Sequence, residues 1–194
     1  RNDREVVMAA VKASYDAMTY ASDELQNDPE IMIEAVKQFG SVIEWANDEL
    51  RDNRAVMIAA IRTDADTLRY ASNRLKNDKE IILMAVQQLW YALKYAGNEL
   101  KNDPDFILEA LRINGAALEF ANETFRGDID FIKVAVMSNS NALYCVSDDL
   151  KNDREVVKTL VKISGFALPH ASAELRNDRE IVMAAVEKNG CALR

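Results

Sequence analysis

The sequence predicts an all-α solenoid, and three features lead to that fold class: a fixed period of 25 residues, apolar residues at helical spacing, and helix-end residues at constant places. The third place of every period holds Asp or Asn: Asp3, Asp28, Asn53, Asp78, Asp103, Asp128, Asp153 and Asp178. A unit this short cannot bury its apolar face alone, so neighbouring units must pack against one another. We expect seven full two-helix repeats and a truncated eighth, forming one continuous helical-repeat domain over residues 1–194.

The first helix of each repeat is expected to start directly after position 3, counting positions 1–25 within each repeat. Proline follows the aspartate at Pro29 and Pro104, and proline is favoured as the first helical residue, which makes position 3 the N-cap. Positions 6, 7, 10 and 11 are apolar in nearly every repeat and share one helix face. Position 15 is often glycine, which predicts a left-handed turn after the helix: Gly40, Gly115, Gly165 and Gly190.

A second, shorter helix is predicted over positions 17–25, where the pattern Ala-Leu-x-x-Ala-x-x-x-Leu places one apolar face toward the core. Repeat 4 shows this pattern in Ala92, Leu93, Ala96 and Leu100. Position 22 carries small polar residues such as Ser22, which are disfavoured inside helices. We therefore expect the second helix to bend or restart at position 22.

The repeat resembles an uncharacterised tandem repeat known only as a domain of unknown function, with a consensus near N-D-R-E-V-V-x-A-A-V-x-x-N-G-x-A-L-x-Y-A-S-x-E-L-K. The resemblance is carried by segments such as 152–159, 164–168 and 171–175, and it extends over the whole chain. Such repeats are associated with large multidomain proteins of intracellular bacterial pathogens and of protists. The resemblance implies a helical-repeat fold and a secreted effector as the context. It implies no reaction, because the matching residues are caps, core and turns.

The composition limits the partners and the compartment. A formal net charge of -8 argues against a nucleic-acid or anionic-membrane surface, and no apolar run approaches the ~18 residues that cross a bilayer. The two cysteines, Cys145 and Cys191, stand at different repeat positions, whereas a disulfide framework would recur with the repeat. We expect reduced thiols in a reducing compartment, either the cytoplasm or, for a secreted effector, the host cytosol.

One pair of residues would suit nucleophilic catalysis, namely Cys145 with His170, the only histidine. Both stand at position 20 of adjacent repeats, in a row that otherwise holds semi-buried aromatic residues, so the leading interpretation is structural. The carboxylates of position 3 are expected to cap their own helices, and they lie a full repeat apart, too far to share a metal ion. We expect no enzyme, no cofactor and no metal site, and we keep a thiol enzyme using Cys145 and His170 as an alternative.

The central repeat departs from the repeat pattern at a surface turn, where Leu89, Trp90 and Tyr91 replace the polar turn found in repeat 5. Exposed aromatic residues are typical anchors of protein interfaces; the alternative is that these side chains fold back over the solenoid edge. The candidate partner-binding residues are Leu89, Trp90 and Tyr91, flanked by the basic residues Arg62, Lys94 and Arg112. We expect a non-catalytic scaffold for protein–protein interaction, with an inert architectural spacer between functional domains as the alternative.

Both ends of the chain keep apolar residues where the terminal repeats of a complete solenoid carry a polar outer face. Repeat 1 retains Val6 and Val7, and repeat 8 retains Val182 and Met183. We expect the chain to be an excerpt of a longer protein and, in isolation, to self-associate end to end.

Overall fold

Every repeat begins with an α-helix of ten residues over positions 4–13, in a computed structural model that describes residues 1–193. These long helices are α1 (Arg4–Ala13), α3 (Pro29–Gln38), α5 (Arg54–Thr63), α7 (Lys79–Gln88), α9 (Pro104–Ile113), α11 (Ile129–Ser138), α13 (Arg154–Ile163) and α14 (Arg179–Lys188). In each of them the side chain of position 3 accepts hydrogen bonds from backbone N–H groups of the first turn, which confirms the predicted N-caps. The chain leaves each helix at position 14 in an extended conformation.

The predicted second helix is divided in two. A 3-10 helix begins at position 15 of each repeat: η1 (Tyr15–Tyr20), η2 (Gly40–Trp45), η3 (Ala65–Tyr70), η4 (Trp90–Tyr95), η5 (Gly115–Phe120), η6 (Ser140–Cys145), η7 (Gly165–His170) and η9 (Gly190–Leu193). A short α-helix then begins at position 23 of repeats 1–6: α2 (Asp23–Gln26), α4 (Asp48–Arg51), α6 (Asn73–Lys76), α8 (Asn98–Lys101), α10 (Glu123–Gly127) and α12 (Asp148–Asn152). Repeat 7 has the 3-10 helix η8 (Leu175–Asn177) instead. Side chains of Ser72, Asn122 and Ser147 cap the short helices, so the predicted restart at position 22 is confirmed.

The glycines of position 15 do not adopt the left-handed conformation that the sequence predicts, because no residue in the described part of the chain has a positive φ. Their role is close packing. A Cβ atom on Gly115 would lie 1.9 Å from the carbonyl oxygen of Ala135, and one on Gly165 would lie 2.4 Å from that of Ala185. Each of these carbonyls belongs to the long helix of the next repeat, so glycine allows two repeats to approach more closely than a side chain would permit.

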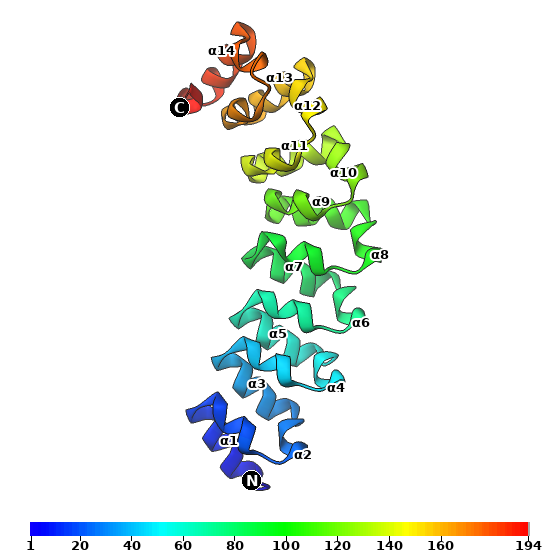
Figure 1. Ribbon diagram of the computed structural model, residues 1–194, viewed down its shortest axis with the longest axis vertical. Coiled ribbons are helices and arrows are strands. Elements are labelled where there is room, and N and C mark those ends of the chain that lie inside the picture. Colours follow the sequence, from blue (N-terminus) through cyan, green and yellow to red (C-terminus); the bar gives the residue numbers. More distant parts are fainter. Residues whose placement is uncertain (194) are drawn as a thin grey trace. The chain divides into compact units, whose positions relative to one another are not determined.

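The repeats form two compact units, Arg1–Asn98 (unit 1) and Glu99–Arg194 (unit 2). In unit 1 the helices α1, α3, α5 and α7 pack in sequence order, and η2, η3 and η4 pack in the same order as a second layer. The short helices α2, α4 and α6 lie along one edge of this unit (Figure 1). In unit 2 the long helices α9, α11, α13 and α14 form one layer and the 3-10 helices η5, η6, η7 and η9 form the other. The apolar core lies between the two layers of each unit.

Position 1 of the repeat has a structural reason to be basic. Lys76 Nζ donates to the carbonyl oxygen of Arg69 at 2.9 Å, and Arg51 Nη2 donates to that of Glu44 at 2.6 Å. Each bond satisfies a carbonyl near the C-terminal end of the preceding 3-10 helix. Burial lowers the pKa of Lys76 from its ordinary value. The basic row at position 1 therefore stabilises the fold.

In three odd-numbered repeats, an arginine at position 4 joins its own repeat to the next one. Arg4 pairs with Asp28 at 2.9 Å and with Glu30, and the same contacts recur twice: Arg54 with Asp78 and Glu80, and Arg154 with Asp178 and Glu180. We call this arrangement the arginine clamp. Lys158 and Arg154 together hold the pKa of the Glu180 carboxyl at about 2. Repeat 5 has Pro104 in place of the arginine, so the clamp is missing from one odd–even pair.

Candidate functional site

The candidate site of unit 1 is built on two adjacent 3-10 helices, η3 and η4. Positions 17 and 18 of each helix are buried against the long-helix layer, as Leu68 and Leu93 illustrate. Positions 16, 19 and 20 remain half-buried or exposed in both helices. Because η3 and η4 are copies of the same element packed side by side, their outer side chains come into contact.

Lys94 lies between two tyrosine rings of η4. Its Nζ atom is 4.3 Å from the ring centroid of Tyr91 and 4.6 Å from that of Tyr95. Trp90 meets Tyr91 edge to face, with ring centroids 5.8 Å apart and planes at 84°. An ammonium group over aromatic faces and an edge-to-face ring pair are both attractive arrangements, so the four side chains stabilise one another. Trp90 still exposes 36% of its surface.

Tyr95 links η4 to η3. Its hydroxyl donates to Oδ1 of Asp66 at 2.7 Å, and Oδ2 of Asp66 pairs with Nη1 of Arg69 at 2.7 Å. The guanidinium of Arg69 lies 4.7 Å from the ring centroid of Tyr70 and donates to its hydroxyl. Burial, followed by the hydrogen bond to Asp66, raises the pKa of Tyr95 to about 12, so this hydroxyl remains a donor at neutral pH.

These contacts define one surface, which we call the aromatic–cation patch: Asp66, Arg69, Tyr70, Trp90, Tyr91, Lys94 and Tyr95. The patch presents an indole, three phenol rings and both signs of charge on a backbone that is anchored to the core. Such a surface can bind apolar groups and carboxylates.

The structure brings together three of the residues singled out from the sequence, namely Trp90, Tyr91 and Lys94. Leu89 is half-buried at the C-terminal end of α7, where its backbone N–H donates to the carbonyl oxygen of Ala85 at 2.8 Å. Two of the predicted flanking residues lie on long helices: Arg62 is exposed on α5, and Arg112 is exposed on α9 of unit 2. The remaining members of the patch, in η3 and at Tyr95, were not predicted. Their signal was the aromatic row at position 20 together with charges at positions 16 and 19.

A second surface of unit 1 is a shallow groove beside Trp45. It is lined by Met18, Thr19, Gln26, Met32, Val42 and Trp45. The sequence predicts that the aromatic residues of position 20 are semi-buried, but Tyr20 is 66% exposed and Trp45 is 64% exposed. The prediction is wrong at these two residues, because in repeats 1 and 2 no network like that of Asp66 and Tyr95 covers the ring.

The predicted thiol–imidazole pair belongs to unit 2. Cys145 is half-buried, and its Sγ donates to the carbonyl oxygen of Ala142 in the same 3-10 helix at 2.9 Å. The ring of His170 meets Tyr144 edge to face at 4.5 Å between centroids. Burial raises the pKa of the Cys145 thiol and lowers the pKa of His170. A nucleophilic cysteine needs a lowered thiol pKa, so both shifts favour the structural interpretation.

Residues 1–193 hold neither a metal-ligand cluster nor a membrane-spanning helix. Within that range, no three His, Cys, Asp or Glu side chains are grouped as a metal ion would require. None of the helices described there combines the length and the apolar character that crossing a bilayer requires.

Comparison with known proteins identifies one family. A family model described as a domain of unknown function (DUF4116) matches residues 3–51, 53–101, 103–151 and 153–194. Each match begins in an odd-numbered repeat and continues into the next, so the family unit is the same odd–even pair that the arginine clamp joins. No curated protein and no solved structure matches the chain.

Proposed function

The chain belongs to the DUF4116 family, whose function is unknown, and we propose that this member is a non-catalytic helical-repeat scaffold that binds a protein partner through the aromatic–cation patch. A helical-repeat array offers an extended surface to which neighbouring repeats contribute together. The patch uses two repeats in this way, because η3 and η4 supply its residues jointly.

The observation that supports the proposal is the arrangement of Trp90, Tyr91 and Lys94. Trp90 is partly exposed and held against Tyr91, so little side-chain freedom remains to be lost on binding. Tryptophan and tyrosine are enriched among the residues that dominate protein interfaces. The partner that fits presents an apolar side chain to Trp90 and a carboxylate to Lys94.

The test compares proteins captured by the wild-type chain with those captured by the double variant Trp90→Ala, Tyr91→Ala. We expect the affinity for the true partner, measured by calorimetry once it is identified, to fall by at least about 30-fold, as for interface anchors of this type. The melting temperature should fall only modestly, because the double variant removes the contacts of Trp90 and Tyr91 with each other and with Lys94 but no fully buried core side chain.

The matched control is Trp45→Ala, which removes the chain's other tryptophan from an exposed position of the same unit. Binding that survives in Trp45→Ala but not in the double variant supports the proposal. If the double variant loses several kcal/mol of unfolding free energy while its folded fraction binds normally, these residues serve the core. If no captured protein depends on the patch, the chain acts as an inert spacer between functional domains.

The compartment is part of the same proposal. Both cysteines are free thiols, which supports a reducing environment such as the cytoplasm, or a host cytosol if the parent protein is an effector.

A further inference from the structure

The groove beside Trp45 has a counterpart in unit 2 that is closed. Positions 1, 7, 17, 18 and 20 of the repeat line both, with Gln26 at position 1 in unit 1 and Lys151 in unit 2. The space in unit 2 is about 10 Å³, whereas the groove in unit 1 has a volume of about 250 Å³. The first volume holds at most one water molecule. The second lies below the roughly 300–1,000 Å³ of pockets for whole small molecules, so the groove suits a side chain of a partner.

The residue at position 1 accounts for the difference. Arg51, at position 1 of repeat 3, donates to the carbonyl oxygen at position 19 of the preceding repeat, and its guanidinium lies 5.9 Å from the ring centroid of Tyr70 at position 20. Gln26 is the only uncharged residue at position 1. Its Nε2 still donates to the position-19 carbonyl of Thr19 at 3.5 Å, but the amide brings no positive charge. In the described part of the chain, no cation lies over the ring of Trp45.

The floor of the groove is apolar. Met18, Met32 and Val42 line it, and all three side chains are buried. Methionine side chains adapt their shape to what they contact, so the floor can accept aliphatic groups of different outline. Trp45 forms an exposed aromatic wall beside this floor.

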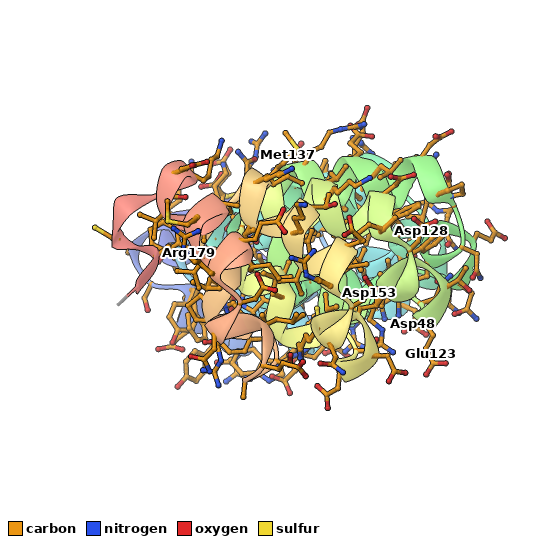
Figure 2. The ribbon with its side chains drawn as sticks, turned by 90° about the horizontal axis from the view of Figure 1, so that it is seen from above. Asp48, Glu123, Asp128, Met137, Asp153 and Arg179 are labelled. Carbon is orange, nitrogen blue, oxygen red and sulfur yellow. The ribbon has the colours of Figure 1, made fainter. Side chains whose placement is uncertain are left out.

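The surroundings of the groove are acidic. Residues 13–50 include every residue that lines it, and Lys37, which pairs with Glu34 at 2.6 Å, is their single basic residue. Five exposed carboxylates stand within three residues of a lining residue along the chain: Asp16, Asp23, Glu24, Glu44 and Asp48 (Asp48 is labelled in Figure 2). Within residues 1–193 none of these five forms an ion pair. The rim therefore attracts positive charge.

We propose that this groove binds a basic segment of a protein partner, which gives Trp45 the cation that position 1 provides to Tyr70. A lysine or arginine of the segment lies over the indole ring, and a neighbouring apolar side chain enters the groove. The carboxylates of the rim attract the other basic residues of the segment. This inference does not rest on the proposed function, because the groove and the aromatic–cation patch share no residue and select opposite charges.

The experiment selects peptides from a random library displayed on phage. The wild-type chain is the bait, and the variant Gln26→Lys removes peptides that bind elsewhere. This variant introduces the residue type that Lys76 and Lys151 already hold at position 1, so the fold should tolerate it. We expect the enriched peptides to combine lysine or arginine with an apolar residue. A labelled synthetic copy of the most enriched peptide is then titrated with each variant by fluorescence anisotropy.

The variants are expected to weaken binding to different degrees. Trp45→Ala should raise the Kd about 30-fold, because it removes the aromatic anchor. Gln26→Lys should raise it at least about ten-fold, because its ammonium group repels the basic peptide. Glu44→Gln should raise it only about three-fold, since an exposed charge contributes little. The matched control is Glu119→Gln, which removes an exposed carboxylate from the same position of repeat 5 and should bind like the wild type.

The double variant Trp90→Ala, Tyr91→Ala separates this groove from the aromatic–cation patch, and it should bind the peptide like the wild type. Circular dichroism verifies that each variant is folded. Three results would overturn the proposal: a selection that enriches no peptide, enriched peptides that are acidic or uncharged, and binding that Trp45→Ala leaves unchanged.

Discussion

The 3-10 helices η4 of unit 1 and η6 of unit 2 have the same length and place in the repeat but carry different surfaces. Their inner positions agree, since Leu93 and Leu143 are both buried. Their outer position 20 differs, holding Tyr95 in one and Cys145 in the other. Burial raises the pKa of both groups, yet Tyr95 donates to Asp66 of the neighbouring repeat, whereas Cys145 donates to a carbonyl of its own turn.

This difference separates two kinds of position within one repeat. The inner positions are constrained by the layer beneath them, so they remain alike wherever the repeat occurs. The outer positions can join adjacent repeats into a shared surface, as at η4, or end in a local contact, as at η6. Surface features of this family should therefore be sought at positions 15, 16, 19 and 20.

The largest effect on stability is expected at the inner positions, which are buried in both η4 and η6. Leu93→Ala and Leu143→Ala should each lower the free energy of unfolding by about 3 kcal/mol, because each removes a buried leucine from between two layers. Urea denaturation followed by circular dichroism measures both values. Met137→Ala, at a side chain that is 74% exposed, is the control and should stay within about 0.5 kcal/mol of the wild type. A loss of unfolding free energy that is large for one variant and negligible for the other would show that the inner positions of η4 and η6 are not equivalent.

A smaller effect is expected at Cys145. Its burial and raised thiol pKa predict alkylation by iodoacetamide at least about ten-fold slower than at the exposed Cys191, measured by mass spectrometry of the folded protein. His170→Ala should leave the rate at Cys145 unchanged, because the thiol donates to Ala142. Fast, pH-dependent alkylation that disappears in His170→Ala would instead support the thiol-enzyme alternative.

The smallest effect concerns Tyr95. Asp66→Asn removes the charge that favours the protonated phenol, so the pKa of Tyr95 should fall from about 12 toward its ordinary value of 10.0. Because the folded-state pKa is raised, this tyrosine contributes stability that is complete below pH 10 and is lost as pH rises through about 12. NMR titration of labelled tyrosine measures the shift. An unchanged pKa would mean that burial alone sets it and that the link between η3 and η4 is weak.

Features set by contacts between near neighbours in the sequence were predictable. Asp28 caps α3 through N–H groups two and three residues later, so its role follows from the local order of residues. The helix starts marked by Pro29 and Pro104 at position 4, and the restart of the second helix at position 22, also depend on residues close together in the sequence.

Features set by contacts between repeats were harder to predict. The glycine of position 15 suggested a left-handed turn, but its reason is the carbonyl of a helix about 20 residues later, as Gly165 and Ala185 show. The 3-10 geometry was also missed, because spacing in the pattern Ala-Leu-x-x-Ala does not distinguish it from a short α-helix. The arginine clamp did leave a signal, since Arg4, Arg54 and Arg154 stand at position 4 of odd-numbered repeats, whereas repeat 8 is the one even-numbered repeat with arginine there, Arg179. That signal becomes visible when the chain is aligned in steps of 50 residues.

The arginine clamp has a consequence for how such arrays change length during evolution. In the first two pairs the donors Arg4 and Arg54 stand in odd repeats, and the carboxylates that they contact stand in the even repeats that follow. Loss of repeat 2 alone would place Arg4 before Asn53 and Ala55, which offer no carboxylate at positions 3 and 5. Loss or duplication of a whole pair keeps each donor next to its carboxylates, so we expect arrays of this kind to lengthen by two repeats at a time.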